Sequence, residues 1–205
     1  MSKTLKLVAV AAAATLTLAA CSTNGDTGSK TTSSSQSASS SSSMHNDADV
    51  SFAQDMIPHH AQAVVMATMA QARASDPKVK ALAVDIKAAQ GPEIEQMSGW
   101  LKAWGEKVPA TDSASGDMSG HDMGSMDGDT PGMMSSGQMS RLGMASGAMF
   151  DRMWLRMMIQ HHEGAVEMAG TEQRDGQSSD AVALAKKIEA AQTAEISQMQ
   201  EMLGV

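Results

Sequence analysis

Residues 56–67 read MIPHHAQAVVMA and residues 158–169 read MIQHHEGAVEMA, so one phrase occurs twice in this chain of 205 residues. The copies are 102 residues apart (161 − 59 = 102) and hold four of the six histidines. The same offset aligns Asp49 with Asp151, and Phe52 with Trp154. Self-similarity at a fixed distance is typical of a duplicated structural unit. The repeat therefore predicts two copies of one element, each with a pair of adjacent histidines.

A helix is expected through each phrase, because apolar residues recur at steps of three, four and seven. In the first copy these residues are Phe52, Met56, Ala63, Met66 and Ala70, and the helix is expected to reach about Arg73. A second helix is expected to start at residues 75–77, where a capping side chain precedes a proline, and to end near Gly105. The second copy repeats this pattern from residue 178 onward.

The pattern thus predicts two tandem helical hairpins, at residues 47–105 and 147–205. Each hairpin has one apolar face that must be buried, and packing the two faces together gives an all-α four-helix bundle. Residues 106–146 form a Met- and Gly-rich loop between the hairpins, with a short helical stretch expected from Gln138 to Ser146.

Residues 1–21 have the features of an export signal, with two lysines followed by an apolar run from Leu7 to Leu18. The run ends in LAAC at residues 18–21, which resembles the bacterial lipobox, in which the cysteine is lipidated. The alternative is a plain secretory signal with an incidental Cys21. Residues 22–46 are rich in Ser and Thr and predict a disordered tether, with His45 as a solvated loop residue at its end. We therefore expect an extracytoplasmic protein, anchored to a bacterial cell membrane by lipid on Cys21.

The composition excludes some classes of partner. The formal charge is −8 and the basic residues form no cluster, so we expect neither nucleic acid nor anionic lipid head groups as partners. Cys21 is the only cysteine, which excludes an internal disulfide and a thiolate cluster. The chain has 20 methionines but only two Phe, three Trp and no Tyr. Methionine fills irregular cores and is also a soft thioether ligand, so its abundance indicates packing, metal binding or both.

The histidines of the bundle permit two interpretations. Consecutive helical residues point about 100° apart, so we expect the second histidine of each phrase to face the centre and the first to lie at the edge of the seam. Either each inward histidine pairs with a glutamate of its own hairpin and serves packing, or histidines and methionines together hold a metal ion. The Glu-x-x-His motif of di-iron bundles is missing from both partner helices. The candidate ligands in the bundle are His59, His60, His161, His162, Met56, Met66, Met158, Met168, Glu93 and Glu195.

A second candidate site lies in the central loop. Exposed methionine is unfavourable, so its repetition around a histidine in a hydrophilic, Gly-rich loop indicates more than a spacer. Cu(I) accepts thioether and imidazole ligands at low coordination number, which favours Cu(I) over Cu(II) here, with zinc as the alternative metal. We expect no metal to be required for folding. The candidate ligands in the loop are Met118, His121, Met123, Met126, Met133 and Met134.

Over about residues 47–203 the sequence resembles the bacterial family called domain of unknown function 305. The resemblance lies in the repeated Met-Ile-x-His-His-x-x-Ala-Val-x-Met-Ala phrase and in several shorter marks. These are Asp49-x-x-Phe52, Gln90-x-x-Glu93-Ile94-x-x-Met97, Trp100-Leu101, Pro131-Gly132-Met133-Met134, Phe150-Asp151 and Gln192-x-x-Glu195-Ile196-x-x-Met199. The resemblance implies a ferritin-like four-helix fold, export and, in some members, copper binding and copper tolerance, but no reaction. The Met and His enrichment of residues 117–126 exceeds the family pattern and strengthens the case for copper.

Our leading hypothesis is a lipid-anchored copper-binding protein that sequesters the ion or passes it on. The loop would capture copper and the bundle histidines would form a second site. One alternative is a structural bundle whose histidines serve packing only. Another is a redox enzyme with a metal centre in the bundle, although the sequence has no complete catalytic motif. The sequence identifies neither a copper donor or acceptor protein nor an oligomeric state.

Overall fold

The computed structural model describes residues 44–111 and 130–204. Within these ranges the chain forms helices and connecting segments, without strands. The helices are α1 (Asp47–Arg73), α2 (Pro77–Trp104), α3 (Ser136–Met144), α4 (Gly147–Asp175) and α5 (Ser179–Leu203). The expected export signal, Cys21, and the loop residues Met118, His121, Met123 and Met126 lie outside the described residues. In the described part of the chain, no helix combines the length and the apolar character needed to cross a membrane.

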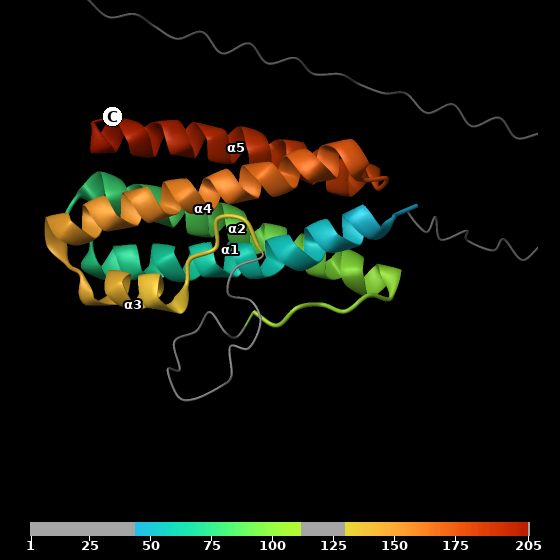
Figure 1. The fold of residues 1–205 in the computed structure, drawn as a ribbon, viewed down its shortest axis with the longest axis horizontal. Helices are drawn as coiled ribbons and strands as arrows, with labels where there is room; N and C mark the ends of the chain where they lie inside the picture. Colours follow the sequence, from blue (N-terminus) through green and yellow to red (C-terminus); the bar gives the residue numbers. More distant parts are fainter. Residues whose placement is uncertain (1–43, 112–129, 205) are drawn as a thin grey trace, which may run out of the picture. The chain divides into compact units, whose positions relative to one another are not determined.

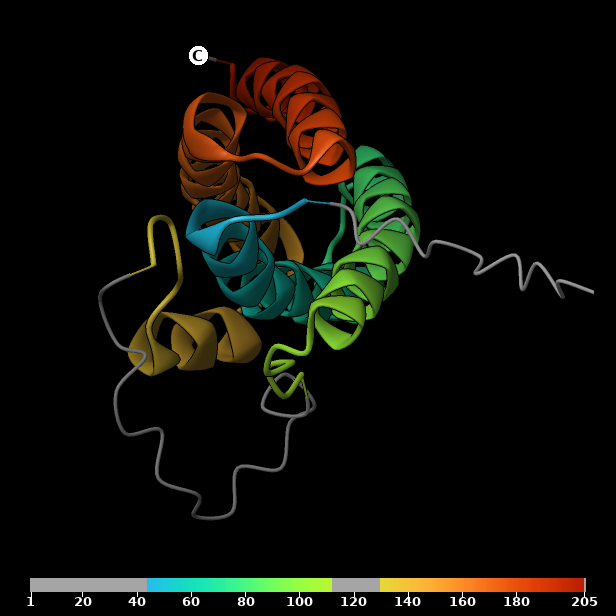
Figure 2. The same ribbon diagram turned by 90° about the vertical axis from the view of Figure 1, so that its right-hand side faces the viewer.

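The four long helices form the predicted bundle of two hairpins. Helix α1 packs against α2, and α4 packs against α5, so the two helices of each hairpin pack on each other. The two hairpins meet mainly where α1 packs on α4 (Figures 1 and 2). The short helix α3 lies outside the ring of long helices, as the end-on view in Figure 2 shows. The all-α four-helix fold expected from the repeat is therefore confirmed.

Local signals explain where the helices begin. Asn46 is the N-cap of α1: its side chain accepts hydrogen bonds from the backbone N–H groups of Ala48 and Asp49. Asp76 caps α2, with Pro77 in the first turn as expected. His45, which was expected to be a solvated loop residue, stacks on Trp104 with ring centroids 4.5 Å apart.

Methionine and small residues fill much of the core, which holds few aromatic side chains. The largest side chains that are fully buried include Trp154, Phe150 and five methionines, namely Met56, Met66, Met97, Met158 and Met199. Trp154 donates a hydrogen bond from Nε1 to the backbone carbonyl of Met66, 2.9 Å away, which ties α4 to α1. The segment between the hairpins, expected to be a Met- and Gly-rich loop, also contributes to the core, because Met134 is only 4% exposed.

Two aspartates at equivalent repeat positions link the hairpins reciprocally. Asp49 on α1 accepts hydrogen bonds from the backbone N–H groups of Gln177 and Ser178, in the turn of the second hairpin. Asp151 on α4 accepts from the backbone N–H groups of Ser75 and Asp76, in the turn of the first hairpin, each at 3.0 Å. Each buried carboxylate thus accepts hydrogen bonds from backbone N–H groups in the turn of the opposite hairpin, which has no acceptor of its own for them.

The two aspartates differ in one partner. Asp151 also accepts a hydrogen bond from the Ser75 hydroxyl, whereas the equivalent residue near Asp49 is Gln177. On that side the carboxyl of Glu172 is buried, and neither of its oxygens makes a hydrogen bond of ordinary geometry. Burial, followed by the effect of the neighbouring Asp49, raises the pKa of Glu172 to about 8, so its carboxyl is neutral at pH 7. Asp49 is therefore accompanied by a neutral buried acid, whereas Asp151 is accompanied by the Ser75 hydroxyl.

We predict that Asp151→Ala destabilises the bundle by about 2 kcal/mol, because it leaves turn N–H groups without an acceptor. Urea unfolding followed by circular dichroism measures the loss. Asp85→Ala is the matched control, since Asp85 lies exposed in the middle of α2 and its loss is expected to change stability by less than about 0.5 kcal/mol. Equal losses in the two variants would contradict the role given to Asp151.

A second prediction concerns pH. Because the pKa of Glu172 is about 8 in the folded protein and 4.5 for an ordinary glutamate, the folded state holds the proton more tightly, and stability falls as pH rises from about 4.5 to about 8. Glu172→Gln keeps a neutral side chain of the same size and removes this titration. The Tm of the wild type should therefore fall relative to that of Glu172→Gln across this window. Parallel Tm curves would show that burial does not raise the pKa of Glu172.

Candidate metal centre

The two histidine phrases meet at the contact between α1 and α4. All four histidines, His59, His60, His161 and His162, are 0% exposed. The expectation that the first histidine of each phrase lies at the edge of the seam is therefore wrong. His59 and His161 face each other between the two hairpins, with ring centroids 3.7 Å apart and ring planes at 34°. On an isolated helix, each of these histidines lies at the side of the apolar face. The packing of α1 on α4 buries both of them.

The second histidine of each phrase pairs with a glutamate of its own hairpin, as predicted. His60 Nε2 lies 2.9 Å from Glu93 Oε2, and His162 Nε2 lies 2.7 Å from Glu195 Oε2. These pairs use the Nε2 atom of each ring, which leaves only the Nδ1 atoms of His60 and His162 without a hydrogen bond. The pairs fasten α1 to α2 and α4 to α5, which is the packing role considered for them.

The pair His59 and His161 is much less well satisfied. His59 Nε2 lies 3.2 Å from the backbone carbonyl of Pro131, and His59 Nδ1 has no hydrogen-bond partner. Neither ring nitrogen of His161 makes a hydrogen bond of ordinary geometry. Buried polar atoms in proteins are nearly always paired, so three unpaired ring nitrogens at one contact need an explanation.

The electrostatics of the pair keep both rings neutral. Burial lowers the pKa of His59 to about 3, with a further contribution from the neighbouring His60 and His162. Burial also holds the pKa of His161 well below its usual value, followed by the effect of His59. The neutral imidazole is the form that binds metal ions. The pair therefore presents ring nitrogens in a ligand-competent state at neutral pH.

Buried methionines lie on the same helices as the pair. Met56 and Met158, one helical turn before His59 and His161, are 0% exposed, as is Met66 on α1. Met168 is partly buried and packs against the apolar cluster that contains Met56. From the central loop, Met134 is buried and Met133 is half-buried. The structure thus brings part of the predicted ligand set together, while Met118, His121, Met123 and Met126 lie outside the described residues.

The sequence analysis missed the segment that covers the histidine pair, Thr130–Ser135, which we call the strap. It arches over α1 beside α4 before it enters α3 (Figure 1). Its Pro131 carbonyl contacts His59, and its Met134 backbone exchanges two hydrogen bonds with the Gln62 side chain, at 2.7 and 2.9 Å. A signal for it existed in the Pro131-Gly132 pair, but the sequence alone does not show where this pair docks.

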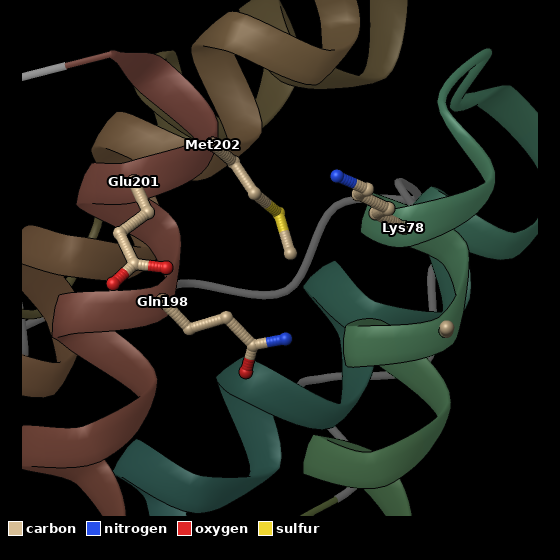
Figure 3. A pocket seen from close by; sticks show the side chains of 5 residues that line it. Lys78, Gln198, Glu201 and Met202 are labelled. Carbon is tan, nitrogen blue, oxygen red and sulfur yellow. The ribbon is translucent and has the colours of Figure 1, made fainter.

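Other features of the described residues lie away from the pair. In residues 44–111 and 130–204 no group of three or more His, Cys, Asp or Glu side chains is placed to hold one metal ion. A groove of about 530 Å³ lies between the start of α2 and the end of α5. Figure 3 shows Gln198 and Met202 of α5 projecting toward Lys78 of α2 across this groove. None of the histidines lines the groove, so it is separate from the candidate centre.

Comparison with known proteins identifies relatives along most of the chain. The model of the family described as Domain of unknown function (DUF305) matches residues 49–203. A DUF305 protein of Streptomyces coelicolor, described as secreted, is 32% identical with a TM-score of 0.66, covering 77% of this chain and 92% of its own. A DUF305 fragment from Deinococcus radiodurans is 30% identical with a TM-score of 0.65, covering 78% and 97%.

Metal-bound structures are among the similar ones. CopM in its Cu(II)-bound form is 35% identical to this chain with a TM-score of 0.60, covering 75% of this chain and 94% of its own. CopM has also been solved in Cu(I)-bound and Ag-bound forms. A shorter match, 40% identical over 53 residues, is the uncharacterized protein L153 of Acanthamoeba polyphaga mimivirus; it spans 26% of this chain and 35% of the viral protein.

The His–Glu pairs give a third prediction. Glu93→Ala leaves the buried Nε2 of His60 without its partner, and we expect a loss of about 1–3 kcal/mol in the free energy of unfolding. Glu95→Ala on the same helix is the matched control, because Glu95 is exposed and should change stability by less than about 0.5 kcal/mol. Chemical denaturation of both variants tests this, and a Glu93→Ala protein as stable as the control would show that the pair does not stabilise the bundle.

Proposed function

We propose, given that the chain belongs to the DUF305 family, that it binds copper outside the cytoplasm and either sequesters the ion or passes it on. In this proposal the protein is a binding protein rather than an enzyme. Export by residues 1–21 and lipidation of Cys21 would place it at the outer face of a bacterial cell membrane. Copper is its cargo, and the bundle folds without it.

The observation that carries the proposal is the buried pair His59 and His161. Two neutral imidazoles in contact, with three ring nitrogens unpaired and buried thioethers one turn away, form a soft to borderline donor set. Cu(I) accepts such donors at low coordination number, so a pair of imidazoles and a thioether suffice without a third His or a carboxylate. The residues present therefore fit Cu(I) well. Zinc remains the alternative metal, with Glu93 and Glu195 as further oxygen ligands.

Relatives support the choice of metal. CopM, which resembles this chain over three quarters of its length, has been solved with Cu(I), Cu(II) and Ag. Silver(I), like Cu(I), is a soft monovalent ion that prefers thioether and imidazole donors over carboxylate oxygen. The methionine content of this chain, 20 residues, is consistent with the same preference.

Within the proposal the central loop captures the ion and the bundle retains it. The loop ligands would be Met118, His121, Met123 and Met126, with Met133 and Met134 between the loop and the bundle. A donor-rich, Gly-rich sequence can wrap Cu(I) without a preformed cage, which suits capture. A buried, neutral histidine pair holds an ion away from water and other ligands, which suits storage.

A structural role is the second candidate function, and it applies to two of the four histidines in the bundle. His60 and His162 already use Nε2 in hydrogen bonds with glutamates of their own hairpins. Their geometry is that of packing pairs, which supports leaving them out of the primary metal site. The candidate ligands in the bundle are accordingly His59 and His161, with Met56, Met158 and Met66 near them.

The test is titration of the mature protein with Cu(I) against a chromophoric competing ligand. We expect more than one bound ion in the wild type, and the loss of one class of site in the variant Met118→Leu, His121→Gln, Met123→Leu, Met126→Leu. The matched control is Asp117→Asn with Asp127→Asn, which changes the same loop without removing a soft donor. An unchanged titration in the four-residue variant would remove the loop from the mechanism.

The bundle site is tested separately with His59→Gln combined with His161→Gln. Loss of the remaining class of site, with the helical circular dichroism spectrum retained, is the expected result. A thermal midpoint that copper raises in the wild type but not in this variant would locate binding in the folded bundle. Titration curves identical to the wild type would contradict the role given to the pair.

A further inference from the structure

We propose that the strap, residues 130–135, is the gate of the histidine pair, closed in this structure and opened to admit or release the ion. The inference rests on the proposed function for the identity of the ion, but the gate itself is a property of the metal-free protein. The pair is 0% exposed, so a ligand can reach it only if a covering element moves. Among the described residues that cover the pair, the strap is a short segment outside any helix, whereas the other covers are long packed helices.

The strap fits against α4 through two glycines. Gly132 has a φ of +76°, and a Cβ there would lie 2.7 Å from the Gln160 carbonyl and 2.8 Å from the His161 carbonyl. On the helix side, a Cβ at Gly164 would overlap the backbone of Pro131. The backbone of the strap thus lies directly on the backbone of α4, with no side chain between them. The strap therefore covers the turn of α4 that contains His161.

On α1 the strap is fastened by one side chain. Gln62 donates from Nε2 to the Met134 carbonyl at 2.9 Å and accepts from the Met134 N–H at 2.7 Å. Gln62 and Gly164 occupy the same position of the repeat, since 62 + 102 = 164. Both residues therefore lie three positions after the first histidine of their phrase. In the first copy Gln62 binds the strap by hydrogen bonds, and in the second copy Gly164 leaves room for the strap backbone. The two copies differ at this position, which allows a single strap to pack against both helices.

The closed strap also occupies a ligand atom. The Pro131 carbonyl lies 3.2 Å from His59 Nε2, and it is the one hydrogen-bond partner that this ring has. When the strap lifts, this nitrogen and those of His161 become accessible together. The far end of the strap is anchored at Ser135, which caps α3 in a capping box with Gln138. Opening therefore moves the residues before Ser135, and the Gln62 hydrogen bonds to Met134 are contacts that must break.

The gate is tested in the metal-free protein by the rate at which diethyl pyrocarbonate modifies each histidine, read by peptide mass spectrometry. Gln62→Ala removes both clamp hydrogen bonds, and we expect about tenfold faster modification of His59 and His161. Gly164→Ala forces Pro131 off the helix and should act in the same direction. Gly170→Ala on the same helix is the matched control, because a Cβ there meets only the Arg174 side chain at an ordinary 3.5 Å, and no change is expected.

His60 and His162 serve as the internal reference. Opening of the strap exposes only the pair, whereas global unfolding exposes all four histidines to the same extent. Faster modification confined to His59 and His161 supports the gate. Unchanged modification in both strap variants, or equal acceleration at all four histidines, overturns it.

A second measurement separates the gate from the proposed function. The rate of Ag(I) or Cu(I) uptake into the loop-deficient variant is followed with and without Gln62→Ala, and faster uptake with the clamp removed is expected. If the pair reacts faster with diethyl pyrocarbonate but takes up neither ion in any variant, the copper site in the bundle is overturned, and with it the function of the strap as an ion gate. If the ion binds at the pair at the same rate with and without the clamp, the gate is overturned and the copper site stands.

Discussion

Burying four histidines at one level of a small bundle lowers the free energy of unfolding, and the rest of the structure must offset this loss. Burying an imidazole nitrogen without a partner is unfavourable, and charging it there is more so, which is why burial lowers the pKa of His59 to about 3. Two of the four histidines pair Nε2 with glutamates of their own hairpins, which leaves only their Nδ1 atoms unpaired. The other two face each other across the contact between α1 and α4 with their rings tilted, and three of their four ring nitrogens are unpaired. A site that keeps donors unsatisfied in the core gives up stability, and such sites are characteristic of function.

The duplication explains why the two hairpins make equivalent contacts. The positions at which the two copies differ indicate where the copies have acquired different roles. The reciprocal aspartates Asp49 and Asp151 preserve the symmetry, because each fastens the turn of the opposite hairpin. Among the positions that differ between the copies, three bear on these contacts: Glu172 replaces Ala70, Gln177 replaces Ser75, and Gly164 replaces Gln62. The first two lie near the aspartates: Asp151 accepts a hydrogen bond from the Ser75 hydroxyl, whereas the raised pKa of Glu172 keeps a neutral carboxyl beside Asp49. The third allows one strap to cover both histidines of the pair.

Much of the fold follows from the sequence because the determinants are local. Helical periodicity ended the first helix at about Arg73, as observed, and the short helix expected from Gln138 to Ser146 occurs at residues 136–144. The His–Glu pairing was also predictable, since both residues belong to one hairpin. The burial of His59 and His161 was predicted wrongly because it depends on how two hairpins cross, which a helical wheel does not contain. The strap could not be placed for the same reason, since its contacts are with residues about 70 positions or 30 positions away.

The central claim is that His59 and His161 are the metal-binding histidines of the bundle, whereas His60 and His162 hold the hairpins together. Nuclear magnetic resonance of the ring nitrogens in histidine-labelled protein tests it most directly, during titration of the loop-deficient variant with Ag(I) as a stable substitute for Cu(I). The account predicts that the ring nitrogens of His59 and His161 shift with one equivalent of ion, while the Nε2 signals of His60 and His162 stay hydrogen-bonded to glutamate. Shifts at His60 and His162 alone, or none at any of the four, would contradict it.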